Sequence, residues 1–266
     1  MITSSNKKSE FILNIYIGMF LLFMFIPLLL MMAAGFNVTD PPSVTDWQGF
    51  TLKWFYQLKT EDRLIRCLGN SFKIVGVVVP LSVMLGLSAA LILTRIRAKV
   101  TTYLYAVLVS PMLTPGIILG ITTIVFWQKI GVNANLFTVM LAQTSFIATY
   151  PMLIIMSRLQ RQDRFQEEAA MDLGASPLLL FWRITIPFLK PAIFTSAALA
   201  FLMSFENYNT TVFSIGSNCT VTTEIAQQAR KAHTPVINAL GFIFVSLTIV
   251  GAFTYAFFHR RRFSRN

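Results

Sequence analysis

Long apolar runs recur along this chain and decide its fold class. Each run has about 20 residues or more, enough for a helix to cross a hydrocarbon core of about 30 Å. Charged residues make up only 12% of the chain, about half of the ~25% that is usual in soluble domains. The sequence excludes a soluble globular fold and predicts an all-α polytopic membrane protein, with residues 1–266 forming one transmembrane domain. The six predicted spans are 11–34, 70–94, 102–127, 136–157, 190–213 and 237–258.

Lysine and arginine are distributed unevenly between the two ends of these spans. With a cytoplasmic amino terminus, fourteen of the 22 basic residues fall in cytoplasmic segments. Since short cytoplasmic loops of membrane proteins are enriched in Lys and Arg, both termini are predicted to be cytoplasmic. The net charge of +11 is therefore interpreted as a topology signal facing anionic membrane lipid, and no nucleic-acid partner is expected.

A predicted external segment at 35–69 separates the first two spans. Trp47, Trp54 and Tyr56 suit a membrane interface, and Pro41-Pro42 favours a compact turn. The segment is predicted to form a short folded or interface-lying cap.

The two cysteines, Cys67 and Cys219, both fall outside, where an oxidising compartment permits a disulfide. Two unpaired buried thiols are the commoner arrangement, and the sequence supplies no distance between them. The cysteines and the distant His233 and His259 lack metal-ligand spacing, so no metal site is predicted.

The longest cytoplasmic connection, 158–188, has the pattern of two short helices. Asp163 with Gln166 three residues later is a capping-box pattern, which predicts a helix from about Arg164. Gly174 is suited to end that helix, because glycine readily adopts the left-handed conformation.

A second short helix is predicted after this glycine. Ser176-Pro177 supplies an N-cap and a first-turn proline. This helix is expected to run toward Ile186 and to stop at Pro187.

The first helix of the loop has two readings. Phe165, Ala169 and Leu173 recur every four residues, with Glu168 and Asp172 on a neighbouring stripe. Such a pattern is common on a solvated connector with local ion pairs. Small residues in and after the helix favour docking instead, because they let a partner surface approach the backbone.

The loop resembles the cytoplasmic EAA motif of permease subunits of binding-protein-dependent ABC importers. Glu168-Ala169-Ala170 is followed after three residues by Gly174, then after nine residues by Ile184, and finally by Pro187. Ile186 stands where the family usually has leucine. Asn70-Ser71, Pro111, Ser157-Arg158-Leu159 and Asn238-Ala239-Leu240 extend the resemblance, toward spermidine/putrescine permeases, over about residues 45–255.

This resemblance implies a type I ABC importer permease-like fold in the bacterial inner membrane, with a cytoplasmic coupling helix that docks on a separate ATPase. It implies as partners a pair of ATP-binding subunits, a second similar permease and a solute-binding protein. The residues it assigns to ATPase coupling are Glu168, Ala169, Ala170, Asp172, Gly174, Ile184 and Pro187.

Neither an energy source nor a catalytic site is predicted in this chain. No glycine is followed by lysine, so the phosphate-binding G-x-x-x-x-G-K-[ST] loop is missing from the sequence. No Ser/His/Asp-like set is evident either. The chain is predicted to be a transport subunit and no enzyme, with no cofactor of its own.

The fifth predicted span contains an acidic residue, Glu206, followed by the polar Asn207, Tyr208 and Asn209. A carboxylate inside a bilayer costs about 2.5–3.5 kcal/mol on insertion scales and normally faces protein or water. These four residues are therefore predicted to line a substrate pathway. Alternatively, Glu206 reaches the interface at the end of its helix, while the amides join neighbouring helices.

The charge of Glu206 favours a small organic cation as solute, and the resemblance implies one like a polyamine. The related permeases usually have paired aspartates here, whereas Glu206-Asn207 keeps one negative charge. The competing function is an ion-coupled secondary transporter with Glu206 as coupling group. That class tends to contain inverted repeats, and none is evident here.

Prolines interrupt two of the other predicted spans. Pro111 and Pro115-Gly116 fall in the third span, and Tyr150-Pro151 falls in the fourth. Because proline frees backbone carbonyls, membrane helices tolerate it where neighbours or cavity water satisfy them. Together with Glu206, these breaks predict that spans three to five surround the pathway.

Overall fold

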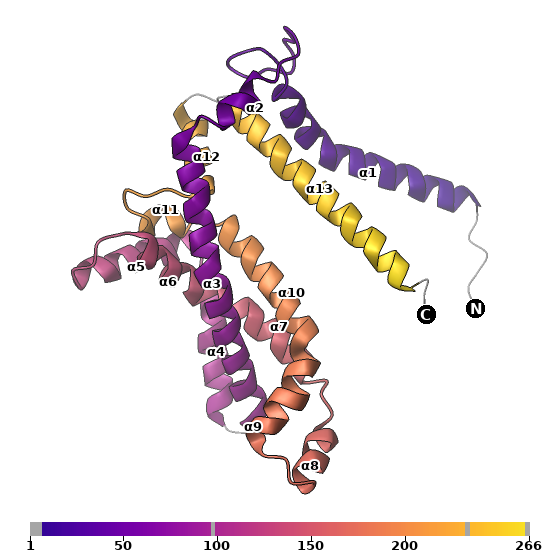
Figure 1. The fold of residues 1–266 in the computed structure, drawn as a ribbon, viewed down its shortest axis with the longest axis vertical. Helices are drawn as coiled ribbons and strands as arrows, with labels where there is room; N and C mark the ends of the chain where they lie inside the picture. Colours follow the sequence, from indigo (N-terminus) through magenta and orange to yellow (C-terminus); the bar gives the residue numbers. More distant parts are fainter. Residues whose placement is uncertain (1–6, 97–98, 232–234, 264–266) are drawn as a thin grey trace. The chain divides into compact units, whose positions relative to one another are not determined.

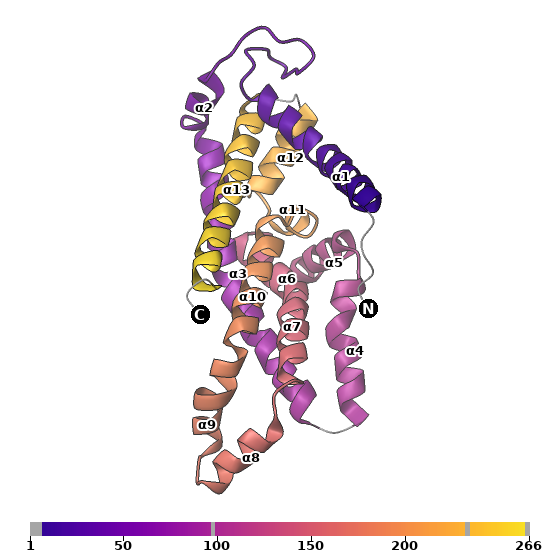
Figure 2. The ribbon, with the colours of Figure 1, turned by 90° about the vertical axis from the view of Figure 1, so that its right-hand side faces the viewer.

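The computed structural model describes residues 7–96, 99–231 and 235–263, which are mostly helical (Figures 1 and 2). Within these ranges no β-strand occurs, and the strand-like pairing is an isolated bridge between Asn37 and Phe50. The helices are α1 (Lys7–Ala34), α2 (Lys53–Leu58), α3 (Asp62–Arg95), α4 (Lys99–Leu113), α5 (Gly116–Lys129), α6 (Leu136–Ile147), α7 (Thr149–Leu159), α8 (Arg164–Asp172), α9 (Pro177–Leu180), the π-helix η1 (Phe181–Thr185), α10 (Ile186–Phe205), α11 (Thr211–Ser214), α12 (Val221–Lys231) and α13 (Pro235–Phe263).

Four helical stretches in the described ranges are long and apolar enough to cross a membrane. They are Ser9–Ala34, Asp62–Arg95, Leu136–Leu159 and Pro177–Phe205. The bent pair α4 and α5 supplies a fifth if it counts as one span. The sixth predicted span falls in α13, whose described apolar part is Pro235–Gly251. The multi-pass helical fold is thus confirmed, and the number of six spans stays a prediction.

The chain forms two compact units. The first contains the segments up to Leu64 and from Ile225 onward, and the second contains Ile65–Glu224. In the first unit α13 contacts both α1 and α2. There the ring of Phe36 packs against those of Phe50, Phe55 and Phe242, with centroids 4.9–5.3 Å apart.

Asn37 organises the turn that follows α1 in the first unit. Its side chain is fully buried and donates from Nδ2 to the backbone carbonyls of Ser43 and Asp46, both at 2.7 Å. Its Oδ1 accepts from the backbone N–H of Gln48 at 3.1 Å. The buried indole of Trp54 donates to the Asn37 carbonyl at 2.7 Å. This part of the 35–69 segment is therefore a folded cap, as its sequence predicts.

Apolar side chains on α3, α7 and α10 form the core of the second unit. The helices α7 and α10 lie side by side in both views (Figures 1 and 2). Where they meet α3, the buried cluster consists of Ala90, Ile155, Leu159, Leu189 and Ala192. A second cluster adds α6 and consists of Ile74, Val78, Val139, Ile147, Ala200 and Ile215.

The third predicted span is broken at Pro115. The helices α4 and α5 meet at an angle of 103°, with Thr114 and Pro115 outside both. Proline lacks the N–H that would continue the helix, and its ring drives the preceding residue out of the helical region. The interruption expected at Pro115-Gly116 is therefore confirmed as a sharp bend, whereas Pro111 lies inside the helix α4 and does not interrupt it.

The helix after Ser176 does not stop at Pro187, so that expectation is wrong. The chain stays helical from Pro177 to Phe205 through the π-helical turn η1. The Ile186 amide bonds to the Phe181 carbonyl five residues back, which widens the helix directly before the proline. Pro187 then lies in the first turn of α10, directly after the wider π-helical turn, in which the regular α-helical hydrogen bonds are already interrupted.

We predict that Asn37→Ala unfolds the cap locally. The substitution removes three hydrogen bonds from a buried site, which should cost about 2 kcal/mol or more. Limited proteolysis of purified protein should then cut residues 38–50 several-fold faster than in the wild type. Gln48→Ala is the matched control, because it keeps the backbone amide that bonds to Asn37. Equal cleavage rates for the Asn37 variant and the wild type would contradict the assignment.

Candidate coupling loop and translocation site

The loop predicted to dock on an ATPase begins with α8, as expected. The Asp163 carboxylate caps this helix by accepting the Phe165 amide at 3.0 Å. The backbone N–H of Gln166 donates to the backbone carbonyl of Asp163, so the capping differs in detail from the predicted capping box. Gly174 has φ +84° and ends the helix in the left-handed conformation, which confirms its predicted role.

The two sides of α8 differ in exposure. Glu168, Ala169 and Asp172 are exposed, and with them the large apolar side chains of Phe165 (77%) and Leu173 (89%). By contrast, Glu167 and Ala170 are half-buried against the rest of the second unit. The helix therefore offers a mixed acidic and apolar surface, here called the docking face, defined by Phe165, Glu168, Ala169, Asp172 and Leu173.

The remaining predicted coupling residues lie beyond α8. The Ser176 hydroxyl caps α9 by accepting the Leu179 amide at 3.3 Å, as the sequence predicts. Ile184 is half-buried within η1, and Pro187 is exposed in the first turn of α10. The motif thus runs from the exposed helix α8 into the long helix that continues through the second unit.

A polar contact missed by the sequence analysis ties α8 to α3. The Arg95 guanidinium donates to the Glu167 carboxylate at 2.7 Å, and the buried Thr185 hydroxyl lies beside both groups. In the sequence analysis Arg95 is only one of the fourteen basic residues that predict the cytoplasmic side. An arginine ending one span and an acid beside the motif were the available signals, but nothing in the sequence paired them.

The predicted pathway residues lie in a break after α10. The helix ends at Phe205, whereas the sequence had predicted a span to residue 213. Asn207 explains the difference, because its Oδ1 accepts both the amide (3.2 Å) and the hydroxyl (3.0 Å) of Thr211, at the start of α11. An asparagine side chain that bonds to the backbone in this way competes with helix continuation.

Within this break the four predicted pathway residues differ in exposure. Glu206 and Asn209 are exposed, while Asn207 and Tyr208 are half-buried. The Asn207 carbonyl also accepts the Thr222 hydroxyl at 3.1 Å. Asn207 is thus engaged within the protein, and Glu206 is left as the exposed charge at the helix end.

A buried hydrogen-bond network lies directly behind this break. Gln143 on α6, 1% exposed, accepts from the Ser204 hydroxyl at 2.6 Å and donates to the Thr211 hydroxyl at 2.8 Å. It therefore connects the end of α10 to the start of α11. Gln143 was missed by the sequence analysis, although a lone amide in an apolar span is a usable signal.

The bent pair α4 and α5 reaches the same break through α5. A Cβ on Gly120 would come within 2.8 Å of the Phe213 ring and 3.0 Å of the Asn209 carbonyl. Only a residue without a side chain permits this approach. Predicted spans three to five therefore do meet at the polar stretch.

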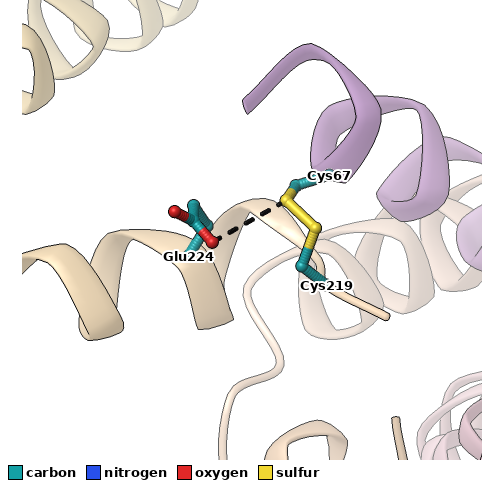
Figure 3. A group of neighbouring side chains, drawn as sticks. All are labelled: Cys67, Cys219 and Glu224. Carbon is teal, nitrogen blue, oxygen red and sulfur yellow. Dashed lines mark hydrogen bonds between the residues drawn. A yellow bond between two sulfur atoms is a disulfide. The ribbon is translucent and has the colours of Figure 1, made fainter. Parts of the chain in front are cut away.

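A disulfide joins Cys67 on α3 to Cys219 after α11, with Cα atoms 4.9 Å apart (Figure 3). Unpaired thiols, the commoner arrangement, are therefore not what the structure contains. Glu224 Oε2 lies 4.0 Å from the Cys67 sulfur. A disulfide sulfur has no proton to donate and is no thiolate ligand, so we interpret this group as a packed contact rather than a metal site.

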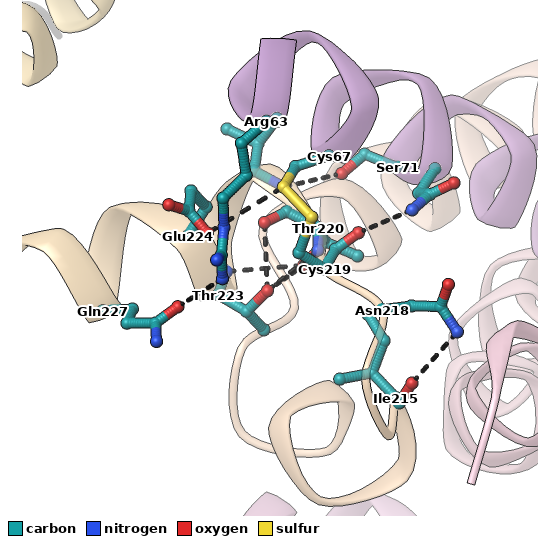
Figure 4. The surroundings of a disulfide bond; sticks show 12 residues. Arg63, Cys67, Ser71, Ile215, Asn218, Cys219, Thr220, Thr223, Glu224 and Gln227 are labelled. Atoms are coloured by element: carbon teal, nitrogen blue, oxygen red, sulfur yellow. Dashed lines mark hydrogen bonds between the residues drawn. A yellow bond between two sulfur atoms is a disulfide. The ribbon is translucent and has the colours of Figure 1, made fainter. Parts of the chain in front are cut away.

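Hydrogen bonds reinforce the bridge (Figure 4). Asn70 donates from Nδ2 to the Cys219 carbonyl at 3.1 Å, and the Val221 amide donates to the Ser71 hydroxyl at 3.0 Å. Asn70-Ser71, which carried part of the family resemblance, thus holds the segment between α11 and α12 against α3.

Comparisons with protein families and with individual relatives indicate the same class of membrane transport protein. Residues 82–264 match the family described as binding-protein-dependent transport system inner membrane component. The putrescine transport system permease protein PotI of Escherichia coli K12 is 30% identical over 238 residues, covering 86% of this chain and 84% of that protein. The spermidine/putrescine transport system permease protein PotC of Haemophilus influenzae is 26% identical, covering 90% and 93%.

Solved structures share the fold. A chain from a bacterial ABC transporter involved in importing the acidic polysaccharide alginate has a TM-score of 0.72 at 16% identity, covering 98% of this chain and 99% of that chain. A chain from an amino acid ABC transporter has a TM-score of 0.58 at 20% identity, covering 80% and 100%. At these identities the likeness concerns the fold alone.

Proposed function

Because the chain belongs to the family of binding-protein-dependent transport system inner membrane components, we propose that it is the transmembrane subunit of an ATP-driven importer. In this proposal it pairs with a second similar permease, two ATP-binding subunits and a solute-binding protein. Movements of the ATP-binding pair would rock the spans between two accessible states around the polar break after α10.

The docking face on α8 carries this proposal. Phe165 on α8 and Leu173 at its C-cap are large apolar residues, 77% and 89% exposed, and the helix also presents Glu168 and Asp172. A solvated connector has no need of two such side chains, since their exposure to water is unfavourable. A groove on an ATP-binding subunit would cover them. Ala169, at the centre of the face, would allow a close approach.

A small organic cation such as a polyamine is the proposed solute. The relatives named for putrescine or spermidine/putrescine transport span most of this chain. Glu206 is the exposed acidic group at the polar break, where its charge can replace part of the water that a cation loses. Asn209, exposed in the same break, supplies a neutral polar group nearby.

The proposed orientation in the bacterial inner membrane puts both termini and α8 in the cytoplasm. Along α3, Cys67 and Arg95 are separated by 28 helical positions, which at 1.5 Å each is about 42 Å. The disulfide and the docking loop therefore lie at opposite ends of a span longer than the ~30 Å hydrocarbon core. Since disulfides persist in the periplasm and are rare in the cytoplasm, the bridge supports the orientation that the basic residues predict.

We predict that Glu168→Arg abolishes productive docking. Reversing this charge on the docking face would place a cation against a partner surface that suits an acid, which costs several kcal/mol at a close interface. Import by reconstituted complex should fall tenfold or more, with less ATP-binding subunit co-purified. Glu10→Arg, on the exposed first turn of α1, is the matched control. Normal import and co-purification for Glu168→Arg would refute the docking assignment.

We predict that Glu206→Gln slows import of radiolabelled putrescine into proteoliposomes by about tenfold. One screened charge pair is worth ~1–4 kcal/mol, and 1.4 kcal/mol is a factor of ten. Glu206→Asp should retain part of the rate, and both variants should bind the ATP-binding subunits normally. Glu61→Gln, in the segment before α3, serves as control. Wild-type rates for Glu206→Gln would leave the polar break as a helix contact only.

The orientation can be tested by labelling single added cysteines with a membrane-impermeant maleimide in intact cells. Ser5→Cys and Ser264→Cys, both outside the described residues, should stay unlabelled until the membrane is permeabilised. Lys59→Cys, in the exposed turn after α2, should react at once. The native bridge is kept, because its oxidised sulfurs do not react with maleimide. Immediate labelling at position 5 or 264 would reverse the proposed topology.

A further inference from the structure

A compact polar cluster surrounds Glu167 on the inner side of α8. One carboxylate oxygen, Oε1, lies 2.7 Å from Nη2 of Arg95 and accepts from the Gln162 amide at 3.1 Å. The Thr185 hydroxyl donates to the same oxygen at 3.4 Å and lies 3.3 Å from Arg95 Nη2. We call these four residues, Arg95, Gln162, Glu167 and Thr185, the Glu167 cluster.

The cluster joins four separate segments of the second unit. Arg95 ends α3, Gln162 lies in the turn after α7, Glu167 belongs to α8 and Thr185 to η1. Three of these segments are ends or continuations of long apolar helices, whereas α8 is the short helix that carries the docking face. Glu167 is thus the residue through which α8 is bonded to the ends of several spans at once.

The surroundings of the cluster shield the Glu167 carboxylate from water, although the Arg95 side chain that it meets is 42% exposed. The side chain of Glu167 is 19% exposed and Thr185 is fully buried. A fully exposed ion pair contributes little to stability, but a carboxylate that accepts from several donors in a partly desolvated site is held more tightly. A cavity of about 280 Å³, lined by Arg95, Gln162 and Glu167 among others, borders the cluster.

Glu167 and Glu168 are neighbours with opposite placements. Glu168 is exposed on the docking face, while Glu167 points inward to the cluster. Two adjacent acids thus divide between the outer and inner sides of one helix. The outer acid can meet a partner subunit, whereas the inner one is already bonded to three residues of its own chain.

We propose that Glu167 is a positioning residue that transmits displacements of α8 to α3 and, through Thr185 and η1, to α10. This inference rests on the proposed function, since it supposes that an ATP-binding subunit moves α8. When α8 moves, the bonds at Oε1 oblige Arg95 and Thr185 to follow. Without these bonds, α8 can move on the turns at its two ends while the spans stay in place.

The test uses the assembled complex in proteoliposomes, with putrescine-loaded solute-binding protein as the stimulus. Glu167→Gln keeps the size of the side chain but removes the charge that holds Arg95. We expect the ATP-binding subunits to co-purify as in the wild type, because the docking face is intact. Stimulation of ATP hydrolysis by the loaded binding protein should fall threefold or more, and the ATP used per putrescine imported should rise threefold or more.

A charge exchange separates transmission from simple stabilisation. In Arg95→Glu/Glu167→Arg the new arginine can donate to the new glutamate, to the Thr185 hydroxyl and to Gln162 Oε1. That amide oxygen is buried without a partner in the described part of the chain. The double variant should recover most of the coupling that each single variant loses. Lys99→Gln, which removes an exposed cation near the start of α4, is the control and should match the wild type.

Each outcome supports or overturns the inference. Wild-type stimulation and ATP-to-solute ratio in Glu167→Gln would overturn it, and so would loss of co-purification, since Glu167 would then belong to the docking face. If the wild-type complex is stimulated without importing putrescine, the stimulation readout alone decides. If the wild-type chain binds no ATP-binding subunit, the proposed function fails first, and this inference fails with it.

Discussion

A chain that leaves the helical conformation in apolar surroundings must find new partners for its backbone amides and carbonyls. The break after α10 depends on this constraint. Asn207 accepts the Thr211 amide, and Gln143 bonds to hydroxyls on both sides of the break. With these groups satisfied internally, Glu206 can remain exposed at the helix end. The polar residues that shape the break are therefore different from Glu206, the residue proposed to meet the solute.

In α8, too, different residues have different proposed roles: some would contact an ATP-binding subunit, and another bonds the helix to its own chain. Its outer side presents Phe165, Glu168 and Leu173, while its inner side is bonded through Glu167. A helix that only docked would need the outer side alone. A helix that transmits a displacement to the spans needs an inner side that is bonded to them as well. A loosely attached helix would rotate by itself, and the spans would stay in place. In the proposed function, α8 and its C-cap residue Leu173 would meet both requirements.

Local signals in the sequence predicted local structure well. The N-cap of α8 at Asp163, the left-handed Gly174 that terminates the helix and the bend at Pro115 each depend on neighbours a few residues away, and each is confirmed. The expected helix end at Pro187 was wrong, because the π-helical turn before this proline depends on the whole helix and not only on adjacent residues. Contacts between residues far apart in the sequence, such as Arg95 with Glu167, could not be predicted, since one sequence supplies residue types but no distances.

The Cys67–Cys219 bridge has a consequence for how the protein is made. Its two cysteines are 152 residues apart, and in the proposed orientation the second emerges only after the fifth span has been inserted. In that orientation Cys67 would remain in the periplasm as a free thiol until the 152 residues up to Cys219 have been translated. Any oxidant that caps it early would block the later partner. In the proposed orientation, formation of the bridge would require that the Cys67 thiol survive until translation is nearly complete, and production in a reducing environment would yield a chain without its covalent link between α3 and the segment before α12.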